Sequence, residues 1–245
     1  MTRNGEHRTL LYWLVVALFA SGCTYHPPIP ASRLGIAFTS RNHTQLKLDC
    51  LPVADYPALK KFHNLGEVQY CWRTATDEKM EALAKVGLPN LRCVTMNGSS
   101  YITDRGITAL AQIPSMDSLG LQGAAVTDAS AELIARRMHP RGVNAAACTN
   151  VTMKGLLALI ETESLESLSM SSEPFSTADF VQLLNAAKNV KWFGIVGKSA
   201  HLNHGAINQA AARKAIARRE KLHVNFHAEG SIFMDNPLPS RESLK

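Results

Sequence analysis

Four histidines near the C-terminal end are the residues of this chain most able to hold a metal ion, since imidazole nitrogens bind zinc, copper, nickel and iron. They are His201, His204, His223 and His227. His223 and His227 lie in an alternating apolar segment typical of a strand, which would separate them by about 13 Å at roughly 3.3 Å per residue. That distance is too large for one metal. A site formed by His201 or His204 with one of the other two stays open as an alternative, but we expect surface or turn histidines and no bound metal or other cofactor.

The segment from Gly194 to Ser199 has the residue types of a phosphate-binding loop without its spacing. It reads Gly-Ile-Val-Gly-Lys-Ser, with two residues between the first glycine and the Gly-Lys pair. A P-loop needs four residues at that point. The segment also falls where the repeat described next predicts a strand and a turn. We therefore predict no nucleotide site here.

A repeated unit is the main signal in the chain. Each unit contains two apolar residues separated by one residue, and the first members of successive pairs are 26, 25, 24, 25 and 25 residues apart. A fixed period in this range is typical of a stacked repeat protein. The pairs are Val68/Tyr70, Val94/Met96, Leu119/Leu121, Val143/Ala145, Leu168/Met170 and Phe193/Ile195.

A short helix is predicted after each apolar pair. Apolar residues recur three, six and seven positions after the first helical residue, which places them on one helix face. Asn185 is the exception. Strand and helix each have an apolar face that neither can bury alone, so stacked units must bury these faces together. Residues able to accept the free N–H groups of the first helical turn precede the helices; they are Thr76, Thr103, Thr127, Thr152, Thr177 and Asn203.

The unit from Leu91 to Ala111 resembles the cysteine-containing, ribonuclease-inhibitor-like subtype of the leucine-rich repeat family. That subtype reads Leu-x-x-Leu-x-Leu, then Cys or Asn, then Ile-Thr-Asp-x-Gly-Leu-x-x-Leu-Ala, and Cys148 falls at its Cys/Asn position. The resemblance covers roughly residues 46–226 and implies an α/β leucine-rich repeat solenoid. This solenoid would be curved, with parallel strands on the concave face and helices on the convex face. We expect Cys148 to be a buried, structural thiol rather than a reactive one.

The concave strand face is where ligands usually bind in leucine-rich repeats, and strand alternation identifies the side chains that point there. This predicted face is nearly free of charge and lacks paired carboxylates, clustered metal ligands and a nucleophile–base pair. We therefore predict no catalytic residues and a protein that is not an enzyme. Trp192 is either an interface hot spot or a residue packed against the C-terminal cap. The candidate binding residues are Gln69, Thr95, Asn97, Gln122, Asn144, Ser167, Ser169, Ser171 and Trp192.

The N-terminus resembles a bacterial lipoprotein signal peptide. Arg3 and Arg8 precede a short apolar run, and Ala-Ser-Gly-Cys follows at residues 20–23. The run is too short for a comfortable transmembrane helix. The resemblance implies cleavage before Cys23 and acylation of its thiol. The predicted boundaries are 1–22 for the signal peptide, 23–41 for the lipid anchor and tether, 42–230 for the leucine-rich repeat domain with its two caps, and 231–245 for a loose tail.

An exported chain meets an oxidising compartment, where disulfides can form. Cys50 and Cys71 fall on adjacent N-terminal units and are the expected pair. The net charge of +6 is spread along the chain, so we expect no nucleic-acid partner.

Together these features predict a lipid-anchored, non-catalytic protein-binding scaffold of the bacterial cell envelope. In a Gram-negative host it would sit on the outer membrane, facing the periplasm or the cell surface. Its partners would be a protein and, through Cys23, the membrane. A structural component of an envelope or secretion assembly, with contacts on the convex helices, is the alternative. A metal-dependent enzyme that uses the C-terminal histidines is less favoured.

Overall fold

The computed structural model describes residues 44–71, 73–197, 216–217 and 222–228, without the side chains of residues 71 and 225–228. The predicted segments 1–22, 23–41 and 231–245, the lipidation residue Cys23, and His201 and His204 therefore lie outside the described residues. The elements in chain order are β1 (Gln45–Lys47), η1 (Val53–Lys61), β2 (Glu67–Cys71), α3 (Asp77–Val86), β3 (Cys93–Asn97), α4 (Asp104–Leu110), β4 (Ser118–Gly120), α5 (Asp128–Leu133), η2 (Ile134–Met138), β5 (Gly142–Asn144), α6 (Met153–Ile160), β6 (Ser167–Ser171), α7 (Thr177–Ala186), β7 (Trp192–Gly197) and β8 (His223–Ala228).

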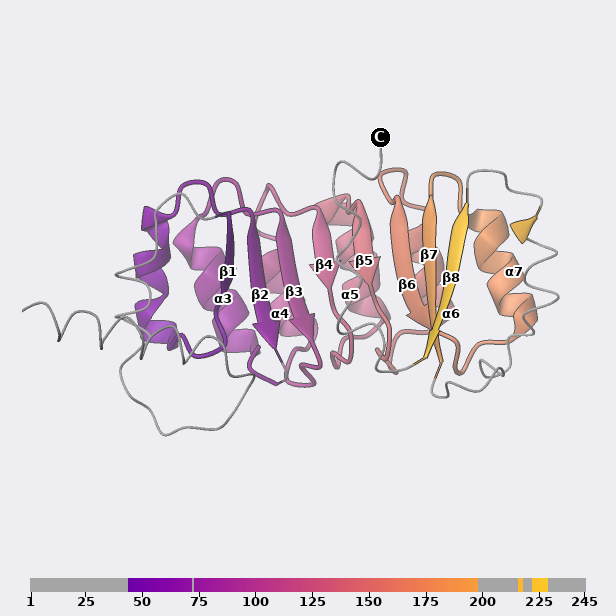
Figure 1. Cartoon of the computed structure of the whole chain (residues 1–245), viewed down its shortest axis with the longest axis horizontal. Helices are drawn as coiled ribbons and strands as arrows, with labels where there is room; N and C mark the ends of the chain where they lie inside the picture. The colour runs from indigo at the N-terminus through magenta and orange to yellow at the C-terminus, as the bar shows by residue number, and fades with distance from the viewer. Residues whose placement is uncertain (1–43, 72, 198–215, 218–221, 229–245) are drawn as a thin grey trace, which may run out of the picture. The chain divides into compact units, whose positions relative to one another are not determined.

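The described strands form one parallel sheet in sequence order, from β1 to β8. Figure 1 shows this sheet as one layer with the helices in a second layer behind it. The register places the first apolar residue of each unit beside that of the next, which confirms that the period read from the sequence is the stacking repeat. The aligned residues are Leu46, Val68, Val94, Leu119, Val143, Leu168, Phe193 and Val224.

This architecture is the predicted α/β leucine-rich repeat solenoid. Its core lies between the two layers, where Val94 and Leu119 from the strands and Leu110 from a helix are fully buried. Neighbouring strands lie about 4.8 Å apart, whereas packed helices need about 8–10 Å. This difference in spacing favours a curve with the strand layer on the inside and the helices on the outside.

Threonine side chains cap the helices from α3 to α6 as predicted. Thr76, Thr103, Thr127 and Thr152 each accept a hydrogen bond from a backbone N–H of the first turn. These bonds satisfy donors that have no partner within the helix.

The prediction of Thr177 as an N-cap was wrong, because α7 begins one residue earlier and Ser176 caps it. The shift turns the helix so that Leu183 and Leu184 are buried and Asn185 is exposed. It therefore explains why Asn185 broke the apolar pattern. The sequence signal was ambiguous because both Ser176 and Thr177 can cap a helix.

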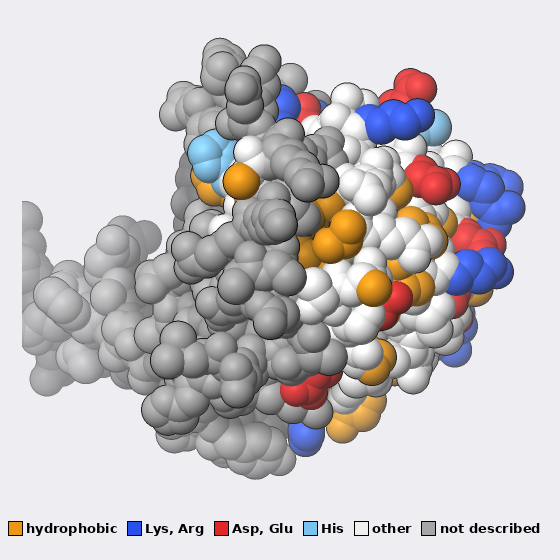
Figure 2. All heavy atoms as spheres, turned by 90° about the vertical axis from the view of Figure 1, so that its right-hand side faces the viewer, with side chains coloured by type: hydrophobic (Ala, Val, Ile, Leu, Met, Phe, Trp, Pro, Cys, Tyr) orange, Lys and Arg blue, Asp and Glu red, His pale blue; other side chains and the backbone are white. Residues whose placement is uncertain are grey.

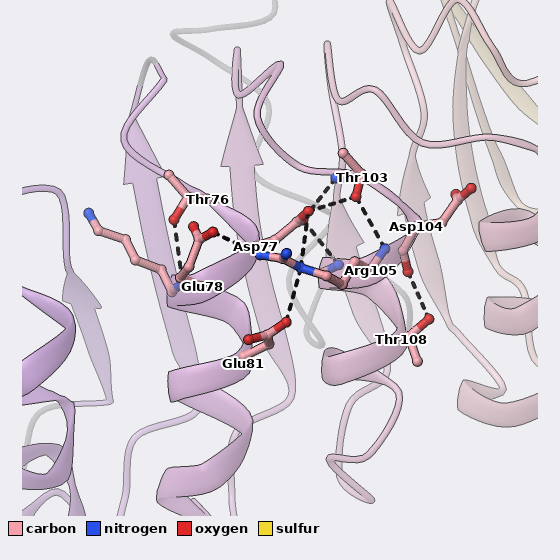
Figure 3. Close-up of polar contacts among 10 residues, drawn as sticks. Thr76, Asp77, Glu78, Glu81, Thr103, Asp104, Arg105 and Thr108 are labelled. Carbon is pink, nitrogen blue, oxygen red and sulfur yellow. Dashed lines mark hydrogen bonds and ion pairs between the residues drawn. The ribbon is translucent and has the colours of Figure 1, made fainter.

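An aspartate on one helix also binds the N-terminus of the next helix. Asp77, the first residue of α3, accepts hydrogen bonds from the backbone N and Oγ1 of Thr103, at 2.9 and 2.6 Å. It also accepts one from the backbone N of Gly106, at 3.0 Å. Figure 3 shows the carboxylate of Asp77 reaching across to the start of α4. We call this contact an aspartate rung.

Two further rungs repeat the arrangement along the helix layer. Asp104 accepts from the N and Oγ1 of Thr127 at 2.9 and 2.7 Å, and from the hydroxyl of Ser130. Asp128 accepts from the N and Oγ1 of Thr152 at 2.7 and 2.6 Å, and from the N of Gly155 at 3.1 Å. The rungs therefore join α3 to α4, α4 to α5 and α5 to α6.

Small residues at the third helical position make room for the rungs. A Cβ added at Gly106 would lie 2.5 Å from Oδ1 of Asp77, and one added at Gly155 would press equally on Asp128. On α5 the equivalent residue is Ser130, whose hydroxyl itself joins the rung. Each aspartate and the small residue in the next unit are thus coupled by sterics.

The rungs make part of the stability depend on pH. Burial opposes ionisation of Asp104, but hydrogen bonds from Ser130 and Thr127 outweigh it, so its pKa lies below the usual value. A carboxylate with a lowered folded-state pKa stabilises the fold above its unfolded value of about 3.9, and this contribution is lost as the pH falls through the folded pKa. We predict that Asp104→Asn lowers the free energy of unfolding by about 1 kcal/mol at pH 7, and that the difference from wild type shrinks below pH 4.

Urea unfolding of both proteins between pH 7 and pH 2.5 measures this difference. Glu161→Gln is the matched control, because it removes an exposed carboxylate at the end of α6 that belongs to no rung. A difference between Asp104→Asn and wild type that stays constant over the whole range would contradict the prediction.

Candidate functional site

The face of the sheet that points away from the helices, called the outer face below, carries a row of small polar side chains held in register. Adjacent strands pair Gln69 with Thr95, Thr95 with Gly120, Gly120 with Asn144, Asn144 with Ser169, and Ser169 with Gly194. We call these six residues the central row. Its four polar side chains are half-buried, as expected for side chains standing close together on one face of a sheet.

The two glycines of the central row leave space that side chains on the neighbouring strands occupy. A Cβ added at Gly194 would lie 2.5 Å from Oγ of Ser169, and one added at Gly120 would lie 2.9 Å from Cγ2 of Thr95. Thr95 and Ser169 therefore cover the glycine on the next strand. The result is a surface without long projecting side chains, formed by hydroxyl, amide and methyl groups.

Asn97 and Ser171 end their strands beside the central row and are also half-buried. Oγ of Ser171 accepts a hydrogen bond from the backbone N of Ala147, at 2.7 Å. This bond ties β6 to the turn after β5, so Ser171 is a structural contact as well as part of the face.

Gln122 and Ser167 were expected on the accessible face, and the structure corrects both. Their exposed fractions are 2% and 7%. Strand β4 ends at Gly120, so Gln122 lies in a turn where in–out alternation no longer applies. Ser167 pairs with Trp192 across the sheet, and the indole is much larger than its neighbour. Neither side chain is available for binding.

Trp192 packs against the terminal strand. Its ring stacks on His223 of β8 with centroids 4.6 Å apart and 21° between the planes. That separation matches the spacing of adjacent strands, so the two rings stand side by side on the sheet. Of the two readings of this residue, the structure favours packing at the C-terminal end, with a half-buried indole.

Charged residues flank the start of the strands rather than the central row. The residue before each of five strands is charged, and the signs alternate from Arg92 through Asp117, Arg141 and Glu166 to Lys191. Arg92 is ion-paired with Asp117. Glu166 forms ion pairs with Arg141 at 2.9 Å and with Lys191 at 3.6 Å. These charges largely satisfy one another. The six residues of the central row are uncharged, and Glu67 and Lys47 lie beside its N-terminal end.

The helices carry most of the exposed charge of the described residues, including Arg105, Arg136 and Lys154. Figure 2 shows Lys, Arg, Asp and Glu side chains gathered along one side of the molecule. A shallow groove of about 390 Å³ lies between the α5–η2 segment and α6, with Lys154 and Glu132 ion-paired across it at 2.7 Å. Its other lining residues are Ala135, Arg136, Leu157, Ala158 and Glu161.

None of the three cysteines whose side chains the structure describes forms a disulfide, and one of them, Cys148, makes a structural hydrogen bond. Sγ of buried Cys148 donates to the carbonyl of Leu121 at 3.1 Å, which confirms its predicted structural role. Burial raises the pKa of Cys148 to about 12. Burial likewise raises the pKa of Cys93, on β3, to about 12. Neither thiol is a nucleophile near neutral pH.

The expected Cys50–Cys71 disulfide is not formed, because Cys50 is an exposed, free thiol. The side chain of Cys71 lies outside the described residues. Lys47 pairs with Gln69, and continuing that register brings Asp49, rather than Cys50, to the level of Cys71.

Groups for metal binding or membrane crossing are not found in the part of the chain that the structure describes. It contains no cluster of three or more His, Cys, Asp or Glu side chains arranged to bind a metal ion. None of its helices combines the length and hydropathy needed to cross a membrane. His223 is exposed on β8, while the side chain of His227 is outside the description.

The aspartate rungs were not predicted from the sequence. A signal was present as Thr-Asp-x-Gly at the start of α4 and Thr-Asp-x-Ser at the start of α5. Recognising it requires knowing that Asp77 lies beside Thr103, 26 residues away. That proximity follows from stacking of the units.

No protein-family model and no curated protein matches the chain. Among solved structures, a chain of the yeast Rad7–Elc1 complex is similar, with a TM-score of 0.42, 13% identity, and 62% of this chain and 50% of that chain covered. A chain of the TLR13–ssRNA13 complex has a TM-score of 0.36 and 11% identity, with 66% and 31% covered. The matched region thus spans about half of the Rad7–Elc1 complex chain and about a third of the TLR13 complex chain. The fold assignment rests on the strand order and register described above.

The environment of the thiols predicts their reactivity. At pH 8 a thiol with a pKa of about 12 is ionised in only about one molecule in ten thousand. We therefore expect N-ethylmaleimide to modify exposed Cys50 rapidly in the folded protein and to leave Cys93 and Cys148 unmodified over the same period. Peptide mass mapping measures the three rates, and labelling in denaturant is the control in which all three react. Labelling of Cys148 as fast as Cys50 in the folded protein would show that its burial is wrongly assigned.

Proposed function

We propose that this chain is a non-catalytic scaffold that binds a protein partner on the outer face of its sheet. The observation that carries the proposal is the central row, in which two uncharged polar side chains are followed by a glycine, twice in succession across the sheet. Short side chains allow close approach of a partner surface. Their hydroxyl and amide groups supply both donors and acceptors of hydrogen bonds.

The chemistry of the face supports binding over catalysis. The described part of this face presents no paired carboxylates and no nucleophile beside a base, and the partly buried thiol of Cys93 has a raised pKa. The charges at the strand starts are engaged with one another. Recognition would therefore depend on shape and neutral hydrogen bonds rather than on charge.

The cell envelope is the proposed location, and acylation of Cys23 is the proposed means of attachment. Support comes from the order of residues 3–23, in which basic residues, an apolar run and Ala-Ser-Gly-Cys follow one another. Acyl chains contribute about 0.8 kcal/mol for each buried CH₂ group, so two or three chains hold a protein firmly to a membrane. The repeat domain would then be displayed at the membrane surface.

A structural role in an envelope or secretion assembly is the second candidate. The groove between α5–η2 and α6 favours it, because alanine and leucine side chains line a depression bordered by charged residues on the helix face. In that case the contacts lie on the helix layer and the sheet face stays free.

Substitutions on opposite faces separate the two candidates. Asn144→Arg places a long charged side chain in the central row, and we expect it to weaken partner binding by about tenfold or more, since an unpaired interface charge costs at least 1.4 kcal/mol. Gln182→Arg is the matched control, because it adds the same charge at an exposed position of α7. Photo-crosslinking in intact cells from residue 144 identifies the partner, and competition with purified partner measures affinity. Loss of binding only with substitutions along the groove, such as Leu157→Arg, would favour the structural role.

Removal of the thiol at residue 23 tests the anchor. We predict that Cys23→Ala moves the protein from the membrane fraction to the soluble fraction and abolishes incorporation of labelled palmitate. Cys50→Ala is the matched control, since it removes an exposed thiol of the repeat domain and should leave both readouts unchanged. If Cys23→Ala still fractionates with membranes, acylation of this residue is not the anchor.

A further inference from the structure

The series of aspartate rungs stops between α6 and α7. The rung position at the start of α6 is occupied by Met153 rather than by an aspartate. A thioether is at best a weak acceptor, so it cannot replace a carboxylate at the N-terminus of the next helix. Among the described residues, α7 is thus the first helix after α4, α5 and α6 that is not capped by its predecessor.

The N-terminus of α7 is satisfied from within the same helix. Oδ2 of Asp179 accepts hydrogen bonds from the backbone N and Oγ of Ser176, at 2.8 and 2.7 Å. Oγ of Ser176 in turn accepts from the backbone N of Asp179, at 3.2 Å. Two of the donors that a rung uses, the N-cap N–H and hydroxyl, are therefore already bonded inside α7.

The two ways of capping exclude each other. Asp179 stands at the third helical position, where α4 and α6 have Gly106 and Gly155. The rungs of this structure have only Gly or Ser there: a Cβ added at Gly106 or Gly155 would press on the incoming carboxylate, and Ser130 fits because its short side chain bonds to it. A helix can accept a carboxylate from its neighbour or supply its own, and α7 does the latter.

The unit that contains α7 also has its own aromatic core. Phe180 of α7 meets Phe193 of β7 edge to face, with ring centroids 5.4 Å apart and an angle of 82°. Both side chains are fully or almost fully buried. Such a pair holds α7 to its own sheet segment.

On the sheet side the connection across the same boundary is intact. Strands β5 and β6 pair over Gly142–Asn144 and Ser167–Ser169. The ion pair of Arg141 with Glu166 and the bond from Ala147 to Ser171 also cross the boundary. Beyond the helices, Nδ2 of Asn189 donates to the carbonyl of Glu163 at 2.8 Å. The boundary is therefore held at the strands and after the helix ends, and lacks its rung at the helix starts.

We propose that the α6–α7 boundary is a built-in joint at which the solenoid flexes. The segment from β6 to β8 turns about the β5–β6 strand pair, and the helix layer opens between α6 and α7. The two sides of the joint carry different parts of the central row, with Gln69, Thr95 and Asn144 on one side and Ser169 on the other. Flexing therefore adjusts the sheet face to its occupant, although the joint itself does not depend on the proposed function.

Hydrogen exchange of the full chain, followed by mass spectrometry, tests the joint. In wild type we expect amides in the middle of α7 to exchange at least tenfold faster than amides in the middle of α4, α5 and α6. Exchange of all four helices at one common protection factor would overturn the proposal. A terminal unit can also fray without a joint, so a variant must separate these causes.

The variant Met153→Asp/Asp179→Gly installs a rung by giving α6 the carboxylate and α7 the small residue. We expect it to slow the exchange of α7 about tenfold. The matched control is Met153→Leu/Asp179→Gly, which removes the self-cap without adding a rung and should not slow exchange. If the first variant folds, by circular dichroism, and α7 still exchanges as in wild type, the missing rung does not create the joint.

The reverse experiment uses an existing rung and covers the case in which the first variant does not fold. Asp128→Asn removes the carboxylate that joins α5 to α6. We expect the boundary of fast exchange to move toward the N-terminus, so that α6 exchanges at least tenfold faster than in wild type. Protection of α6 that is unchanged in this variant would show that rungs do not couple the units and would overturn the proposal.

Discussion

Unpaired N–H groups at the start of each helix are the constraint on which this structure depends. The helices of a solenoid run in the same direction, so their N-termini lie side by side at one edge and their partial positive charges face one another. A carboxylate at the first position of one helix offsets its own helix dipole and accepts hydrogen bonds from the next helix. Asp77, Asp104 and Asp128 do this in succession. One residue type therefore satisfies local donors and fixes the spacing of neighbouring units.

The rungs have consequences for the sheet. Because the helix layer is fixed at the helix starts, strands as short as β4 and β5 can stay in register. The charged residues that precede the strands pair along their own edge. The charged side chains that form rungs and ion pairs thus lie at the helix starts and the strand starts, and the central row itself is uncharged. The low polar surface that we propose as the binding face follows from this distribution.

Much of the fold could be predicted because its signals are local and repeated. The spacing of Val94, Leu119 and Val143 predicted the strand register, and the threonine before each helix predicted where α3 to α6 begin. Predictions were wrong where two adjacent residues offered the same chemistry, as with Ser176 and Thr177, or where a pattern was extended past its element. Gln122 is the second case, since β4 had already ended. Seven of the nine candidate residues lie half-buried on the face as alternation predicts, whereas the burial of Ser167 depends on its neighbour from another strand.

The period, the apolar faces and the starts of α3 to α6 were determined by the sequence alone, because each shows in a local pattern that the chain repeats. The tertiary structure alone decided which donors each aspartate binds. Asp104 and Asp179 both lie in the first turn of a helix, yet the first caps the next helix and the second caps its own. It also decided that Ser167 is buried and that Trp192 stacks on His223. Except for the cap of Asp179 on Ser176, which is local to α7, these contacts join residues about one repeat or more apart, and their geometry exists only once the units have stacked.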